Sequence, residues 1–156
     1  MNFTRHVPRM LDDEHRAHLE LLAGVERELG RGHDSPSVAA ALVRYLEHDV
    51  ERHFVFEEQS LFPRLAEFGD NAVAALLTDE HDSIRAVVEE LMPLARAAAG
   101  GSLGASEAPA LRRCIVELVE RQVAHIQKET MALLPMLDDL LDEDADGELA
   151  SAYAGA

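Results

Sequence analysis

Apolar residues recur along most of the chain at intervals of three or four, which places them on one face of an α-helix. The strict alternation of apolar and polar positions that indicates a strand is almost absent. The spacing predicts four long helices, over about residues 8–29, 36–62, 71–99 and 106–134. Helices joined by short connections pack beside their sequence neighbours, so we expect an all-α, antiparallel up-down-up-down four-helix bundle.

Serine, aspartate and proline mark where the helices begin or bend. Ser35 and Pro36 are typical of a helix start, and Asp70 can cap the third helix. Pro63 should kink or end the second helix, because proline cannot donate a hydrogen bond to the carbonyl four residues earlier. Pro93 lies inside the third helix, where we expect a kink for the same reason.

The chain has 156 residues, 47% of them apolar, which suits a single domain with a buried core. We assign residues 1–137 to the four-helix bundle. Residues 138–156 are acidic and then rich in small side chains; a short helix is one possibility there, but we expect this tail to fray.

Charge and cysteine content narrow the possible partners and the compartment. A net charge of −16 argues against nucleic acid and against anionic membranes, which both need clustered Lys and Arg. No segment approaches the roughly 20 uninterrupted apolar residues of a membrane helix, and the first ten residues lack the apolar core of a signal peptide. The one cysteine, Cys114, cannot form an internal disulfide. We therefore expect a cytoplasmic protein.

Two segments share the pattern H-x-x-x-E-x-x-x-L-x-P-x-L. The first runs from residue 53 to 65 and the second from residue 125 to 137. The tripeptide Asp-Glu-His precedes each segment, at residues 13–15 and 79–81. The chain thus looks like two related halves, each with one lone histidine and one His/Glu pair.

A histidine and a glutamate four residues apart share one face of a helix, with Cβ atoms roughly 5–6 Å apart. Both pairs and both lone histidines give six nitrogen and oxygen ligands without sulfur: His15, His53, Glu57, His81, His125 and Glu129. Six ligands are too many for tetrahedral zinc, and they suit two iron or manganese ions bridged by the carboxylates. The alternative, satisfied core histidines and surface glutamates, does not explain why all four helices place a histidine inward.

Other polar side chains have smaller expected roles. Asp49 and Gln122 could accept the outer N–H of a ligand histidine. His18 could line the mouth of the site or replace a ligand, whereas Tyr45 should mainly pack and Glu58 should point outward. The rest are expected at the surface, apart from the cysteine in the core: His6, His33, His48 and Cys114.

The order H, H-x-x-x-E, H, H-x-x-x-E, with Glu-Glu-Gln-Ser-Leu-Phe-Pro shortly after the second histidine, strongly resembles the hemerythrin-like, or HHE cation-binding, family. The resemblance covers about residues 11–135. It implies a four-helix bundle around a non-haem di-iron centre with an oxo or hydroxo bridge, in which manganese or zinc could substitute. It also implies one iron on His15 and His53, the other on His81 and His125, and bridges from Glu57 and Glu129.

The chain departs from the oxygen-carrying hemerythrins in two places. Those proteins have a fifth histidine in an H-x-x-x-H pair on the third helix, where this chain has Leu77 and Arg85 on either side of His81. Their fourth helix also carries an Asp bridge instead of Glu129. We therefore expect the reduced protein to autoxidise, and to bind NO or consume peroxide, rather than to carry O2.

The sequence leaves three functions open. We favour a cytoplasmic module that binds or senses O2, NO, peroxide or iron itself. The alternatives are a di-iron enzyme that decomposes peroxide or acts in iron-centre repair under nitrosative stress, and a metal-stabilised scaffold. No catalytic residue and no protein partner are assigned, because binding and turnover would use the same ligands.

Overall fold

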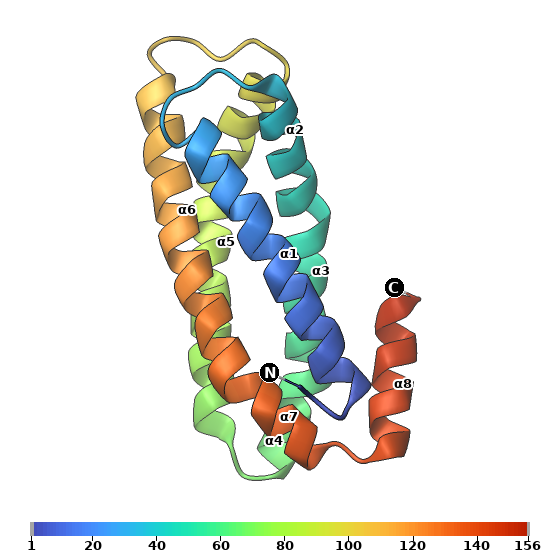
Figure 1. The fold of residues 1–156 in the computed structure, drawn as a ribbon. Helices are drawn as coiled ribbons and strands as arrows, with labels where there is room; N and C mark the ends of the chain where they lie inside the picture. The colour runs from blue at the N-terminus through green and yellow to red at the C-terminus, as the bar shows by residue number, and fades with distance from the viewer. Residues whose placement is uncertain (1, 156) are drawn as a thin grey trace.

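The computed structural model describes residues 2–155, and every regular element in that range is a helix. Four long helices form the antiparallel bundle that the sequence predicts, with α1 beside α2 and α6, and α5 between α2 and α6 (Figure 1). Two of the four contain π-helical turns (η). The elements are α1 (His6–Glu28); α2 (Pro36–Arg44), η1 (Tyr45–Asp49), α3 (Val50–Phe56), η2 (Glu57–Leu61) and α4 (Phe62–Glu67); α5 (Asn71–Ala99); α6 (Ala108–Lys128), η3 (Glu129–Leu133) and α7 (Leu134–Leu140); and α8 (Glu143–Ala154).

The predicted helix starts are largely confirmed. The second helix begins at Pro36, although the side chain of Ser35 makes no capping hydrogen bond. The carboxylate of Asp70 caps α5 by accepting from the backbone N–H of Val73 at 3.4 Å. The helix α5 then continues through Pro93 without a break in its assignment. No helix in the described chain is long and apolar enough to cross a membrane.

The second and fourth long helices each contain a π turn just before an internal proline. The N–H of Phe62 bonds to the carbonyl of Glu57, and the N–H of Leu134 bonds to that of Glu129, in each case five residues back instead of four. A π turn adds one residue to the helix, which lets the chain continue past the next proline, Pro63 in the first case. Both turns begin at a glutamate that the sequence identifies as a ligand.

A layer of polar side chains divides the hydrophobic core in two. Along α1, Leu11 belongs to one apolar cluster, Leu22 belongs to the other, and His15 lies between them. The same order recurs on α5, in Leu77, His81 and Ile84. The two apolar clusters hold the four helices together on either side of the polar layer, and this packing fixes the positions from which its side chains project.

The C-terminal residues form a helix where we expected a frayed tail. Asp142 caps α8 by accepting from the backbone N–H of Ala145 at 2.8 Å. Leu149 and Tyr153 are buried in the apolar cluster that also contains Leu11. The helix lies outside the four-helix bundle, beside the first turns of α1 (Figure 1).

The start of α1 explains why α8 is ordered. No neighbouring side chain caps α1, which leaves its first N–H groups without a local partner. The carboxylate of Asp146 on α8 accepts from the N–H groups of His6 and Val7, at 2.7 and 2.8 Å. The tail therefore supplies the missing cap from a distant part of the chain.

Candidate metal centre

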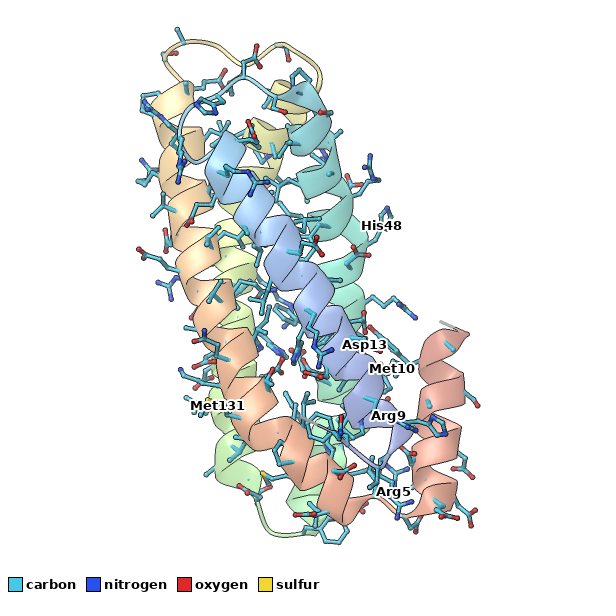
Figure 2. The ribbon with its side chains drawn as sticks, in the orientation of Figure 1. Arg5, Arg9, Met10, Asp13, His48 and Met131 are labelled. Carbon is cyan, nitrogen blue, oxygen red and sulfur yellow. The ribbon has the colours of Figure 1, made fainter. Side chains whose placement is uncertain are left out.

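The six side chains that the sequence singles out meet in the polar layer. Each of them is at most 3% exposed. They come from all four long helices, with one lone histidine on α1 and one on α5, and a His/Glu pair on each of the other two. Side chains placed elsewhere on the same helices, such as His48 and Met131, point away from the bundle (Figure 2).

Glu129 divides its two carboxylate oxygens between two pairs of histidines. Its Oε1 lies 3.1 Å from Nε2 of His15 and 3.6 Å from Nε2 of His53. Its Oε2 lies 3.3 Å from Nε2 of His125 and 3.9 Å from Nε2 of His81. A carboxylate placed in this way can serve two metal positions at once.

Glu57 also reaches from one histidine pair to the other. Its Oε1 lies 3.2 Å from Nε2 of His81 and 3.4 Å from Nε2 of His53. Both oxygens of Glu57 and Oε2 of Glu129 are buried without a hydrogen bond in the described structure. Such atoms are costly unless something pairs with them, and metal ions are suitable partners for carboxylate oxygens.

The donor atoms fall into two groups, each close enough to share an ion. The ligand atoms within each group lie within 4.8 Å of one another. One group is His15, His53 and Glu129, and the other is Glu57, His81, His125 and Glu129. The residues present therefore fit a pair of metal ions that share Glu129.

The carboxylates in and around the layer raise the pKa of neighbouring histidines. Burial alone would lower the pKa of His53, but the carboxylates of Glu57, Glu129 and Glu14 outweigh it and raise that pKa well above its usual value. In the same way, burial opposes the nearby carboxylates at His81, whose pKa rises to about 9. Metal binding must displace these protons, because only a deprotonated imidazole nitrogen can be a ligand.

Carboxylates outside the layer orient the histidines of the second half. Nδ1 of His81 lies 2.6 Å from Oε2 of Glu58, and Nδ1 of His125 lies 2.8 Å from Oε1 of Glu80. Glu58 in turn accepts from Arg85 at 2.8 Å. A partner at the outer nitrogen fixes the tautomer and the ring, so that Nε2 faces inward.

The histidines of the first half have different outer partners. Nδ1 of His15 lies 2.9 Å from the hydroxyl oxygen of Thr130. Nδ1 of His53 faces Oε2 of Glu14 at 3.8 Å, which is longer than a hydrogen bond. The two halves thus share the inner ligands and differ in the groups that hold them.

Sequence reasoning chose the wrong outer partners. Asp49 is exposed, because it lies on the outer face of its helix. Gln122 is buried, but its amide donates to the hydroxyl of Tyr45 at 2.7 Å instead of meeting a histidine ring. Glu58, expected to point outward, contacts His81 because the neighbouring helix α5 passes within its reach.

One signal in the sequence could have identified two of the correct partners. The repeated Asp-Glu-His tripeptide contains Glu14 and Glu80, each directly before a lone histidine. Glu58 and Thr130 occupy equivalent places as well, each directly after a candidate ligand glutamate. The outer partners are therefore sequence neighbours of the ligands.

A small cavity adjoins the layer. It is lined by four of the predicted ligands and by His18, Val50, Phe54, Gln122 and Ile126, and it has no room for a water molecule. His18 lines the site as expected, with its ring centroid 5.0 Å from that of Tyr45. Burial, followed by the nearby charge of His53, lowers the pKa of His18 to about 4. His18 is consequently neutral at pH 7.

The remaining predictions for single residues agree with the structure. Three histidines are exposed, and Cys114 is a free, buried thiol in the apolar cluster that also contains Leu22. The exposed histidines are His6, His33 and His48.

Comparison with known proteins agrees with the geometry. No curated protein matches the chain. The family model for the hemerythrin HHE cation-binding domain matches residues 6–137, which include all six candidate ligands and leave out α8. Because the match covers most of the 156 residues, the chain belongs to the hemerythrin HHE cation-binding family.

Proposed function

We propose that this chain is a non-haem di-iron protein that binds a small ligand, such as O2, NO or peroxide, and senses or buffers it in the cytoplasm. The observation that carries the proposal is the division of Glu129 between two histidine pairs. Imidazole and carboxylate donors without sulfur favour iron, with manganese as a possible substitute. Bound iron would supply redox chemistry and open coordination positions for the ligand.

The side chains around the cavity support ligand binding. Val50, Phe54 and Ile126 form an apolar wall that excludes water next to four candidate ligands. Gln122 is 2% exposed, and its Oε1 has no hydrogen-bond partner in the described structure. A small uncharged molecule suits these largely apolar surroundings, because it needs few polar partners, but the cavity as it stands has no room for one. Side chains must therefore move before such a molecule can bind.

The same surroundings favour binding over turnover. Turnover would need a proton donor at the site, and the carboxylate of Glu58 is instead bound to His81 and Arg85 outside the layer. Burial raises the pKa of the Tyr45 hydroxyl and lowers that of the His18 ring. Neither Tyr45 nor His18 therefore carries an acidic proton ready for transfer at neutral pH.

Metal analysis and spectroscopy test the proposal. The full chain, produced in iron-replete cells, should contain about two iron ions, as the two groups of ligands require. The visible spectrum of the reduced protein should change on addition of O2, NO or peroxide. His48→Ala, at an exposed position, is the control and should behave like the wild type. One tightly bound zinc without iron would contradict the metal assignment, and sustained peroxide consumption would favour an enzyme.

A further inference from the structure

The helix α8 lies beyond the residues that match the family, yet its Tyr153 contacts Glu14, whose other oxygen faces the candidate ligand His53. It packs where α1 begins, and Figure 2 shows Arg5, Arg9 and Met10 at this junction. Asp146 joins the two helices through the backbone N–H groups described above. The docked position of α8 is therefore fixed relative to α1, which carries His15.

Tyr153 connects α8 to His53 through Glu14. The hydroxyl of Tyr153 donates to Oε1 of Glu14 at 2.7 Å. The other oxygen of Glu14, Oε2, faces Nδ1 of His53 at 3.8 Å. Both of these facing atoms are buried and have no hydrogen bond in the described structure. Glu14 thus lies between a fixed donor on α8 and the outer nitrogen of a candidate ligand.

The position of the Tyr153 hydroxyl is set from several sides. The residue is 3% exposed, and its ring centroid lies 4.3 Å from that of Phe56. The guanidinium carbon of Arg52 lies 4.0 Å from the centre of the same ring, and Arg52 also donates to the backbone carbonyl of Tyr153. Arg52 and Phe56 belong to α3, the helix that carries His53. These contacts hold the Tyr153 hydroxyl in a fixed position relative to His53.

The other outer carboxylates do not depend on α8. Glu58 accepts from Arg85 on α5, and Glu80 accepts from Lys128 on α6. Both of these cations belong to the four-helix bundle. Glu14 alone among the three outer carboxylates takes its recorded hydrogen bond from the C-terminal helix.

We propose that Tyr153 is a positioning residue for the metal centre, and that docking of α8 sets the strength of the position formed by His15 and His53. Tyr153 holds Glu14 with its Oε2 facing Nδ1 of His53 at 3.8 Å, and a small approach of the two side chains on metal binding would close this gap to a hydrogen bond. That hydrogen bond would fix the tautomer in which Nε2 is the ligand atom. The inference rests on the proposed function, because it requires that the layer binds two ions.

Cobalt(II) titration of the metal-free full chain tests the proposal, with visible absorption as the signal. The wild type should bind two ions. Tyr153→Phe keeps the ring and removes only the hydroxyl. It should therefore lower the affinity for one ion by at least about threefold and leave the affinity for the other unchanged. Glu14→Gln should lower the affinity for the same ion by about 10- to 100-fold, which is the usual effect of losing a hydrogen-bond partner of a ligand histidine. Ser151→Ala removes an exposed hydroxyl from α8 and should change neither constant.

A double-mutant cycle separates positioning from general loosening of the fold. If Tyr153 acts through Glu14, Tyr153→Phe should have no further effect in the Glu14→Gln background. In the cobalt protein, the paramagnetically shifted, exchangeable N–H signal of His53 should exchange faster with solvent in Tyr153→Phe. A purely structural role for the tyrosine would not select this signal.

Two results would overturn the inference alone. One is a Tyr153→Phe protein with the wild-type binding constants, and the other is an equal effect of that substitution with and without Glu14. If Tyr153→Phe lowers the yield of folded protein, Glu14→Gln tests the same link from α1, and wild-type binding by that variant would also overturn it. A wild-type chain that binds no pair of ions would instead overturn the proposed function, and the inference with it.

Discussion

Nδ1 of His81 lies 2.6 Å from Oε2 of Glu58, whereas the equivalent place in the other half of the chain holds Thr130 beside His15. One inner histidine is thus supported by a carboxylate and its counterpart by a neutral hydroxyl. A carboxylate raises the basicity of a ligand histidine more than a hydroxyl does, because it carries a charge. The two proposed metal positions are therefore unequal, although the inner ligands repeat.

The Glu58 contact predicts a selective loss of metal affinity. Glu58→Gln should lower the affinity for the ion held by His81 and His125 by about 10- to 100-fold, because the negative charge beside Nδ1 of His81 is lost. Isothermal titration of the metal-free protein would measure both constants. Glu51→Gln is the matched control, since Glu51 also pairs with Arg85, at 3.0 Å, but lies at the surface. An equal effect of both substitutions would show that Arg85, and not His81, is the group that matters.

Removal of Glu129 should affect both ions, because its two oxygens face different histidine pairs. Glu129→Ala should therefore lower the bound iron at both positions, whereas His15→Ala should lower it mainly at one. Elemental analysis of the purified proteins would measure the iron content, and circular dichroism would confirm that both variants remain helical. Equal retention of metal in the two variants would place the site elsewhere in the chain.

The stability of the metal-free protein should fall as the pH rises from about 6.5 to about 9. Burial lowers the pKa of His81, but Glu129, Glu57 and Glu58 outweigh it and raise the value to about 9. A raised pKa stabilises the folded state fully below the unfolded value of about 6.5, and this contribution is lost as the pH passes the folded value.

Urea unfolding at pH 6 and at pH 9.5 would measure this loss. The metal-loaded protein should lose less stability over the same range, because its ligand histidines have already released their protons. His81→Gln, measured without metal, should also show a smaller fall, since it lacks the titrating ring. Identical pH profiles for the metal-free and metal-loaded proteins would contradict the prediction.

Stable oxygen carriage is not expected from this centre. The position four residues before His81 is the buried Leu77, and the position four residues after it is Arg85, which is bound to Glu51 and Glu58. Neither can provide a fifth imidazole, so each proposed iron position keeps only two histidines. Stopped-flow mixing of the reduced protein with O2 should show rapid oxidation. A long-lived spectrum that reverses when O2 is removed would restore the carrier interpretation.

The sequence alone predicted the bundle and the six candidate ligands that meet in its polar layer. Helical spacing fixes which side chains share a face, so His53 with Glu57 and His125 with Glu129 were predictable as pairs. Repetition of the pattern in both halves then distinguished these six residues from ordinary core histidines. The pattern acts within a few residues of chain, and for that reason no tertiary information was needed.

Only the tertiary structure decided which groups hold those ligands in place. Thr130 is 115 residues from His15, and Tyr153 is 139 residues from Glu14. Helical periodicity gives the face of each side chain, but it gives neither the rotation of one helix against another nor the height at which they meet. The cap that Asp146 supplies to α1 depends on the same long-range geometry, and this is why an acidic tail that looked frayed in the sequence forms the ordered helix α8.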